Sequence, residues 1–485
     1  MSLRAVDPRF LLPAPPGTAS VIGDPVGWRA GLGGVGVELV DAAAGAPPDL
    51  VVAPATDVAA ALAVGAGHCL ILGGDVTRQV RSHGLEAEVY LAVPDLQAPE
   101  YLVPIAQART VRYFYDVVRV APSRARWYRN RMAARVAGLA RYAAGAQLVT
   151  VVAERIECPL GVAVAARAGR FDPGGWYLSL GQVTADRRVV FSVFDGTSPS
   201  PRLVVKLDRK PRGADALVPE EREGRWLADL ASRDPLLGGH VPRPVADLPC
   251  GRGRATVETA AVGHLLTDFL RGPFTRRRKV VALESVAAWL VAVAVATAHR
   301  EPARRVTATD GPGVGGSGAA SPVAPGPGVP LVLEHGDLWS GNVVYRPGRT
   351  FTVIDWADAD PDGLPLRDLL YFLSDTLALL DGTTTDEDRD RHFGELFRGE
   401  LPSSALLFRW VRALVGALDI DPASVGPLAS WCWEELAAHR RETMADELDH
   451  TVEHAGPEPY EPAIRRAEVW QRDPKLGGGW TAWNA

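Results

Sequence analysis

A short polar loop near residue 340, enclosed by apolar stretches, constrains this chain more than any other feature of its sequence. The loop reads HGDLWSGN over residues 335–342 and follows an apolar run at 331–333. Two further apolar runs come after it, separated by a turn-forming Pro-Gly pair. The pattern predicts a strand, a loop and a hairpin, and the return of the hairpin brings Asp355 beside Asn342.

The polar residues of this loop match the needs of phosphoryl transfer. Such a site requires a carboxylate for the attacking hydroxyl, ligands for a metal ion and a cation for the nucleotide phosphates. Asp337 and Asn342 are five positions apart, the spacing at which kinase catalytic loops hold the base and a magnesium ligand. Asp355 adds a hard oxygen ligand of the kind that Mg²⁺ prefers. The sequence therefore predicts a magnesium-dependent phosphotransferase.

The combined motif resembles the family of aminoglycoside phosphotransferases and choline kinase-like enzymes, whose hallmark is H-G-D-x-x-x-x-N followed by I-D-W or I-D-F. The resemblance extends over roughly residues 175–450. It implies that Asp337 is the catalytic base, that His335 orients the loop, and that Asn342 and Asp355 bind Mg²⁺. It also implies ATP or GTP as the phosphate donor, and an α+β bilobal kinase-like domain with an antiparallel-sheet N-lobe and a helical C-lobe.

The resemblance also assigns the nucleotide-binding residues upstream of the loop. Lys206, one of four lysines in the chain, ends a strand-like run where the family has its phosphate-binding lysine. The family pairs this lysine with a glutamate of the next helix, and Glu223 fits that position better than its neighbours. Backbone groups near Glu258 and Ala260 are expected to meet the adenine edge. The loop that covers the phosphates has one glycine, Gly181, where the family has several.

The N-terminal region, residues 1–145, has a different pattern. Apolar strand-like runs alternate with alanine-rich helical ones, which predicts βαβ units and a doubly wound, Rossmann-like α/β domain. The region loosely resembles a class I methyltransferase sheet, but its loop at 23–27 lacks the full glycine set of a cofactor site. We expect a degenerate, cofactor-free scaffold or partner-binding domain, with an active methyltransferase as the alternative. The basic helical segment at 112–141 is either a solvated face or a docking site for a phosphate or a partner.

The length of 485 residues leaves room for two or three domains. We expect the Rossmann-like domain to be followed by a kinase N-lobe over 146–262 and a C-lobe over 263–485. A Gly/Pro/Ala-rich stretch at 311–330 is expected to form a flexible insert in the C-lobe. The most apolar stretch, 286–298, is shorter than the roughly 20 residues of a membrane-spanning helix, which predicts a buried core helix.

Charge and cysteine content exclude several classes of protein. The net charge of -6, from 52 basic and 58 acidic residues, gives no overall attraction for nucleic acid or an anionic membrane. The four cysteines have no metal-ligand spacing and do not suggest a disulfide framework. The first residues do not form a signal peptide, so we expect a cytoplasmic protein. The oligomeric state is left open.

The phosphate acceptor is expected to be a small molecule with a hydroxyl group, such as an aminoglycoside, a sugar or a related metabolite. Protein kinases have arginine where Gly336 stands, and a glycine where Ala357 follows Trp356. Two alternatives are a nucleotide-binding pseudokinase that acts as an interaction module, and a bifunctional kinase-methyltransferase. The presence of Asp337 argues against the pseudokinase, because a binding module needs no catalytic base.

The helical C-terminal part is expected to bind the acceptor. Acidic residues are frequent over 375–400, and tryptophans and glutamates lie close together over 431–435. An acidic and aromatic surface suits a cationic or sugar acceptor, by charge and by stacking. The alternative is a solvated acidic segment beside a helix that packs its tryptophans inward.

Overall fold

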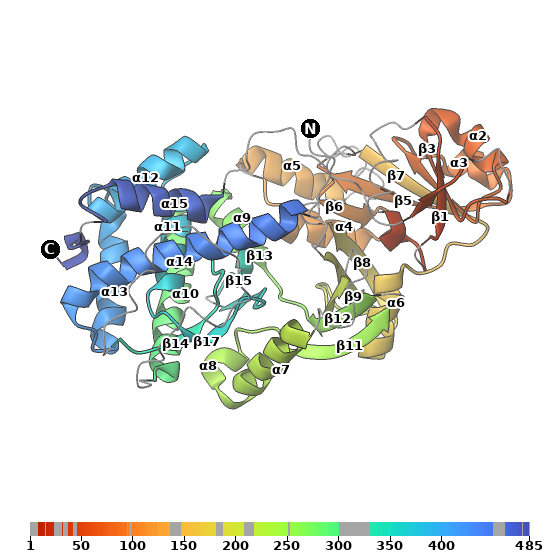
Figure 1. The fold of residues 1–485 in the computed structure, drawn as a ribbon. Coiled ribbons are helices and arrows are strands. Elements are labelled where there is room, and N and C mark those ends of the chain that lie inside the picture. Colours follow the sequence, from red (N-terminus) through yellow and green to blue (C-terminus); the bar gives the residue numbers. More distant parts are fainter. Residues whose placement is uncertain are drawn as a thin grey trace. The chain divides into compact units, whose positions relative to one another are not determined.

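The computed structural model divides the chain into two compact units, each described by itself below. Unit 1 comprises Met1–Glu221, Pro242–Val262 and Asp449–Gly456, and unit 2 comprises Arg222–Val241, Gly263–Leu448 and Pro457–Ala485. Figure 1 gives the element labels used from here on. The structure describes residues 8–14, 16–23, 32, 37–41, 46–94, 96, 99–121, 123–135, 147–180, 188–207, 218–250, 253–299, 329–348, 350–449, 461–477 and 479–484.

A twelve-stranded sheet with the order β11-β12-β10-β9-β8-β6-β5-β7-β4-β3-β1-β2 forms the centre of unit 1. Strands β2, β1, β3 and β4 pair in parallel, and all the other neighbouring pairs are antiparallel. The strands are β1 (Thr18–Val21), β2 (Glu38–Leu39), β3 (Leu50–Pro54), β4 (His68–Leu72), β5 (Glu86–Val93), β6 (Tyr101–Pro104), β7 (Gln147–Ala153), β8 (Pro173–Ser179), β9 (Val189–Asp195), β10 (Leu203–Leu207), β11 (Pro244–Cys250) and β12 (Gly253–Thr259).

The N-terminal strands do not form the doubly wound parallel sheet expected for residues 1–145. Only the four strands at one end are parallel, so the sheet is mixed. Strands β5 and β6 are joined by residues 94–100, a connection too short for the crossover of a dozen or more residues that parallel pairing needs. They therefore pair antiparallel, with Leu91 opposite Val103. Of the proposed cofactor loop at 23–27, only Gly23 lies among the described residues.

The same sheet contains the antiparallel strands expected for the kinase N-lobe. Strand β6 pairs with β8, with Leu102 opposite Leu178. Strand β7, which follows the expected boundary at 145, lies between β4 and β5. The strands on either side of that boundary thus share one hydrogen-bonded sheet. The domain limits drawn from the sequence stay a prediction.

Short helices accompany the sheet of unit 1. They are α2 (Val58–Ala63), α3 (Thr77–Arg81), α4 (Ala108–Tyr113), α5 (Arg124–Arg135) and α6 (Leu160–Gly169). Helix α6 packs against β10, where burial alternates along the strand. Leu203, Val205 and Leu207 are buried in the core, whereas Lys206 points to the opposite face. The sheet thus fixes the face on which the expected phosphate-binding lysine lies.

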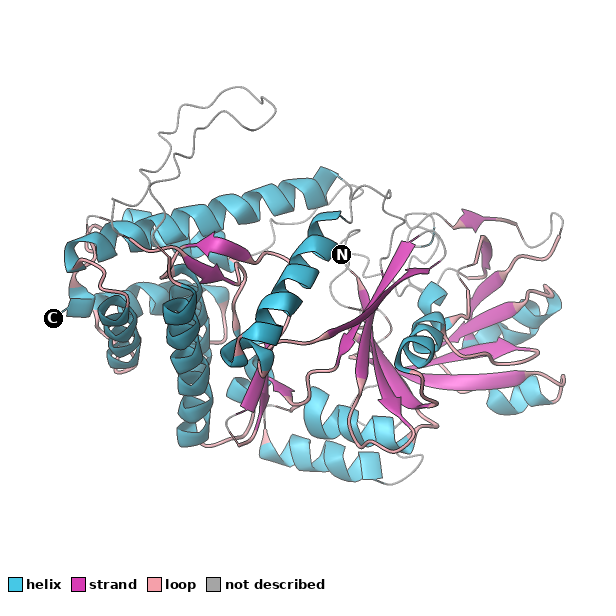
Figure 2. Cartoon of the chain, turned by 90° about the horizontal axis from the view of Figure 1, so that it is seen from below, coloured by secondary structure: helices cyan, strands magenta, loops and turns pink. Residues whose placement is uncertain are grey.

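Unit 2 is mainly helical, as Figure 2 shows by its cyan helices and short magenta strands. The helices are α8 (Pro235–Gly238), α9 (Leu266–Arg271), α10 (Arg276–Thr297), α11 (Arg367–Leu380), α12 (Asp386–Arg398), α13 (Ser404–Ala417), α14 (Pro422–Asp449) and α15 (Pro462–Arg472). Two small sheets accompany them: β13 (His264–Leu265), β15 (Val343–Arg346) and β16 (Thr350–Val353) form one, and β14 (Val332–Glu334) and β17 (Asp360–Gly363) form the other. Helix α7 (Val218–Arg233) contributes residues to both units.

The apolar stretch expected at 286–298 belongs to a longer helix. Helix α10 has 22 residues, and by length and composition alone it could cross a membrane, a test that core helices of soluble proteins also pass. Its residues Leu283, Val286 and Val293 lie in the apolar core of unit 2. The expectation of a core helix therefore agrees with its packing, although the helix is longer than the apolar run suggested.

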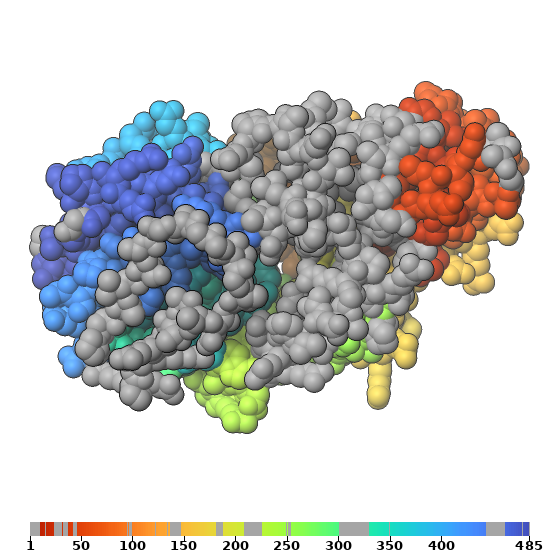
Figure 3. Space-filling model, viewed as in Figure 1, coloured from red at the N-terminus to blue at the C-terminus, as the bar shows by residue number. Residues whose placement is uncertain are grey.

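The C-terminal helices complete this core with aromatic side chains. Trp433 of α14, Trp470 of α15 and Trp480 are each at most 1% exposed. Helices α13 to α15, blue in Figure 3, form part of the surface of the face shown there. The acidic first turn of α12 follows the cap residue Thr385, whose side chain accepts from the amide of Asp388. Acidic side chains at this end of a helix interact favourably with the helix dipole.

Candidate active site

The hairpin β15–β16 has the return that the sequence predicts. Val343 lies opposite Val353 in the ladder. One residue farther along, the amide of Ile354 donates to the carbonyl of Asn342 at 2.9 Å. The register therefore places Asp355 immediately after the residue that is bonded to Asn342.

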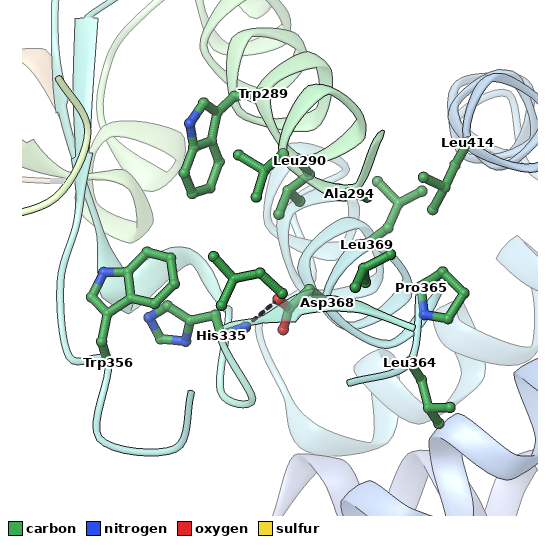
Figure 4. Close-up of a pocket in the computed structure, with 13 residues that line it drawn as sticks. Trp289, Leu290, Ala294, His335, Trp356, Leu364, Pro365, Asp368, Leu369 and Leu414 are labelled. Carbon is green, nitrogen blue, oxygen red and sulfur yellow. Dashed lines mark hydrogen bonds between the residues drawn. The ribbon is translucent and has the colours of Figure 1, made fainter. Parts of the chain in front are cut away.

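His335 anchors the loop to the end of this hairpin. It is 1% exposed, and its Nε2 lies 3.0 Å from the carbonyl oxygen of Ile354. Its ring centroid lies 4.6 Å from that of Trp356. Figure 4 shows the imidazole beside Trp356 at the edge of an apolar pocket that Trp289 also lines. These contacts suit the orienting role that the resemblance implies.

Helix α11 holds the backbone of the loop with two carboxylates. Asp368 accepts from the amides of His335 at 2.6 Å, the dashed line in Figure 4, and of Gly336 at 3.2 Å. Asp375 accepts from the amide of Ser340 at 3.0 Å. The two aspartates are seven positions apart, two helical turns, so they lie on one face of α11. Asp368 thus has a structural role, because it holds the backbone of the loop.

Gly336 is required by the path of the loop. Its φ of +83° lies in the left-handed region, and a Cβ built there would lie 2.2 Å from the carbonyl oxygen of Asp358. A larger residue would have to displace the backbone that follows Trp356. The arginine that protein kinases carry at this position does not fit here.

Asn342 contacts the expected base directly. Its Nδ2 donates to the carbonyl of Asp337 at 2.8 Å and lies 3.3 Å from Oδ2 of the same residue. With the amide nitrogen facing Asp337, the amide oxygen faces away and is available as a ligand. Asp355 has a φ of +65°, an uncommon conformation that aspartate tolerates better than most residues.

These two side chains fit a magnesium ion. The described residues include no cluster of three or more His, Cys, Asp or Glu side chains that could hold a metal ion alone. Mg²⁺ in nucleotide sites takes one or two protein oxygens, and phosphates and water complete its shell. Asn342 and Asp355 would supply such a pair.

A buried ion pair lies behind the loop. Glu334 is 1% exposed, and its carboxylate lies 2.9 Å from Nη1 of Arg367. The amide of Leu364 donates to the same carboxylate at 2.7 Å. Burial raises the pKa of Glu334, and the charge of Arg367 opposes that rise. The pair joins β14 to α11 and so fixes the strand that leads into the loop.

Arg440 is a site residue that the sequence did not indicate. Helix α14 brings its guanidinium to the carboxylate of Asp337, where Nη2 contacts Oδ1. Burial raises the pKa of Asp337, and the charge of Arg440 opposes that rise. Arg440 belongs to no motif and lies 103 residues from Asp337, so no local signal could have revealed it.

The nucleotide residues expected from the resemblance lie in unit 1. Lys206 Nζ is 3.0 Å from Glu258 Oε1, a pair between the neighbouring strands β10 and β12. The amide of Ala260 donates to the carbonyl of Arg202 at 3.0 Å. For Glu223 the structure describes only the backbone, in α7, and Gly181 lies outside the described residues. The pairing of Lys206 with Glu223 stays a prediction.

Comparison with known families identifies the segment that carries the loop. Residues 317–407 match the model of the phosphotransferase enzyme family. This segment belongs to that family. The match confirms the resemblance drawn from the HGDLWSGN loop, and with it the kinase-like fold of this part of the chain. No curated protein matches the chain.

Several solved structures show a partial likeness to this chain. Macrolide 2'-phosphotransferase MphH from Brachybacterium faecium is 21% identical, with 54% of this chain and 98% of that one covered and a TM-score of 0.27. Spectinomycin phosphotransferase, solved with ADP and spectinomycin, is 11% identical, with coverages of 64% and 94% and a TM-score of 0.32. The bifunctional kinase-methyltransferase WbdD is 10% identical, with coverages of 84% and 83% and a TM-score of 0.27. At these values the likenesses assign neither a substrate nor a second activity.

Proposed function

We propose that the chain is a magnesium-dependent phosphotransferase that moves the γ-phosphate of ATP or GTP to a hydroxyl group of a small molecule. The observation that carries this proposal is the joined pair Asp337 and Asn342, with Asp355 returned beside them by the hairpin. A carboxylate beside two oxygen ligands is the minimum that phosphoryl transfer asks of a catalytic loop.

Asp337 accepts the proton of the attacking hydroxyl as the phosphoryl group is transferred. The residue must be ionised to do so, and the adjacent Arg440 favours the ionised form. His335 and Asp368 fix the loop backbone so that this carboxylate is presented in one place. Lys206 supplies the cation for the nucleotide phosphates in this proposal. Mg²⁺ held by Asn342 and Asp355 would neutralise charge on the transferred phosphate.

Fewer side chains are available to bind the acceptor than the sequence suggested. Trp433 packs inward and is not an open binding group. The side chain of Glu435 lies 3.6 Å from Arg367 but is 42% exposed. Trp339, two residues after Asp337, is 37% exposed and offers a ring for stacking. A hydroxylated acceptor with an apolar or cationic face suits such a ring. The acids in the first turn of α12, Asp386, Glu387 and Asp388, are explained by the start of that helix.

The test is a transfer assay with the purified full chain. MgATP and MgGTP are each incubated with aminoglycosides, a macrolide, spectinomycin, free sugars and nucleosides, and products are detected by mass spectrometry. We expect at least one product heavier by a phosphoryl group, and none with Asp337→Asn. If no compound is phosphorylated while Asp337→Asn and the wild type bind nucleotide equally, small hydroxylated molecules are not the acceptors.

A further inference from the structure

Helix α14 delivers a permanent positive charge to the catalytic loop. Arg440 contacts Asp337 Oδ1 through Nη2, and its Nε lies 3.6 Å from Oε1 of Glu461, which precedes α15. The side chains of the central pair are only 17% and 15% exposed. A guanidinium does not lose its proton in a protein, so this charge is present at every working pH.

The Asp337 carboxylate is held on both of its oxygens. Asn342 Nδ2 lies 3.3 Å from Oδ2, and Arg440 occupies Oδ1. The terminal torsion of an aspartate is otherwise broad, so a carboxylate with a single partner can turn. Catalytic groups must be held to within about half an ångström, and an error of about 1 Å costs about a hundredfold in rate.

We propose that Arg440 is a positioning residue for phosphoryl transfer, which fixes the Asp337 carboxylate in the orientation that receives the acceptor hydroxyl. This inference rests on the proposed function, because it gives Arg440 a part in the same reaction. Glu461 restrains the guanidinium from its other side, so α14 and the start of α15 both contribute to the placement of the base. A lysine could supply the charge, but its ammonium lacks the planar fork that contacts two carboxylates at once.

The experiment compares Arg440→Gln, Arg440→Lys and Arg440→Ala with Arg441→Gln, a control at the exposed neighbouring position of α14. Steady-state rates are measured with MgATP and the best acceptor of the transfer assay, and with water as acceptor in its absence. We expect kcat for transfer to fall about a hundredfold in Arg440→Gln, with the nucleotide KM within about twofold of wild type. The kcat of Arg440→Lys should lie between those of Arg440→Gln and the wild type. The kcat of Arg441→Gln should match that of the wild type.

Rescue and stability distinguish positioning from simple charge compensation. Millimolar guanidinium should restore part of the kcat of Arg440→Ala and leave the wild type unchanged, whereas a purely structural ion pair gives no such rescue. The inference is overturned if Arg440→Gln keeps kcat within about twofold of wild type. It is also overturned if kcat falls only together with the melting temperature and nucleotide binding, and guanidinium restores nothing. A wild-type protein that transfers phosphate neither to any acceptor nor to water overturns the proposed function, and this inference with it.

Discussion

At the scale of single residues, the site depends on contacts that few side chains can make. His335, Asn342 and Asp368 each bond to backbone groups of the loop or of the returning hairpin. Backbone groups are fixed by the fold, so these bonds place the side chains precisely relative to it. Asp337 differs, because among the described residues its carboxylate forms hydrogen bonds with the side chains of Asn342 and Arg440.

Removal of the base should separate catalysis from binding. In Asp337→Asn, transfer should fall by a factor of about 10²–10⁴, the usual contribution of a general base. Nucleotide affinity should stay unchanged, because the proposed metal ligands are retained. The transfer assay measures the loss of rate, and calorimetric titration with MgATP measures the nucleotide affinity. Glu387→Gln, at an exposed acid of α12, serves as control. An equal loss of transfer rate in Asp337→Asn and Glu387→Gln would contradict the role of Asp337 as the base.

The loop glycine should be the most sensitive backbone position of the site. Gly336→Ala places a Cβ 2.2 Å from the Asp358 carbonyl at a φ of +83°. Gly382→Ala is a matched control, because its φ is +84° and no atom lies within 4 Å of its Cβ. We expect the control to lower the free energy of unfolding by about 1 kcal/mol, from the backbone conformation alone. Gly336→Ala should cost about 2 kcal/mol more, from the clash. Urea unfolding measures both, and equal values would show that the loop relaxes.

Replacement of Trp339, the exposed tryptophan of the loop, should change the KM of the acceptor alone. Trp339→Ala removes the ring that lies two residues after Asp337, so the acceptor KM should rise about tenfold, for a lost stacking contact of about 1 kcal/mol or more. The nucleotide KM should not change. Trp431→Ala, on the half-buried part of α14, is a comparison with a ring outside the loop. A rise in the acceptor KM only in Trp431→Ala would move the acceptor site to α14.

At the scale of elements, helices far apart in sequence are tied together by a few polar residues. Asp381, at the end of α11, accepts from Arg276 at 2.9 Å and Ser403 at 2.5 Å, and lies 3.0 Å from His392. It therefore joins α10, α12 and α13 to the helix that supports the catalytic loop. Hydrogen bonds and a nearby positive charge stabilise the ionised form of a carboxylate relative to its protonated form.

The stability of unit 2 should fall in acid through this residue. Burial raises the pKa of Asp381, but the hydrogen bonds from His392, Ser403 and Arg276 outweigh burial and lower the pKa to about 2. Because the folded-state pKa is lowered, the stabilisation is present above the unfolded-state value near 4 and is lost as the pH falls toward 2. Because Asp381 is partly exposed, solvent screening reduces this stabilisation to about 1 kcal/mol. The loss between pH 4 and 2 should be smaller in Asp381→Asn than in wild type or in Glu442→Gln, an exposed control on α14. Parallel pH curves of unfolding free energy would contradict this.

At the scale of the whole chain, the first 145 residues and the expected N-lobe form one sheet in unit 1. Strand β7 lies between β4 and β5, and β6 covers the edge of β8. An uncovered strand edge is a site of aggregation, so each half protects the other. Any cofactor-binding test of the N-terminal region therefore needs the full chain.

A chain that begins at residue 146 should fail to fold properly. It would leave β7 without both of its neighbours and expose the edge of β8 that pairs with β6. We expect this fragment to aggregate and to lose nucleotide binding, whereas the full chain unfolds cooperatively. Size-exclusion chromatography and thermal unfolding compare the two. A soluble fragment with wild-type nucleotide affinity would show that the expected domain boundary is also a folding boundary.

The sequence by itself determined the catalytic loop and its hairpin. Their signals are local: a polar motif of fixed spacing, apolar strands on either side and a Pro-Gly turn set the return of Asp355 through backbone pairing alone. The tertiary structure decided the contact of Arg440 with Asp337 and the joining of β6 to β8, because both bring together residues that are far apart in the chain. Side-chain periodicity shows which face of an element is buried, but it does not show which distant residue meets that face. For that reason the kind of chemistry could be predicted from the HGDLWSGN loop, whereas the residue that holds its base in place could not.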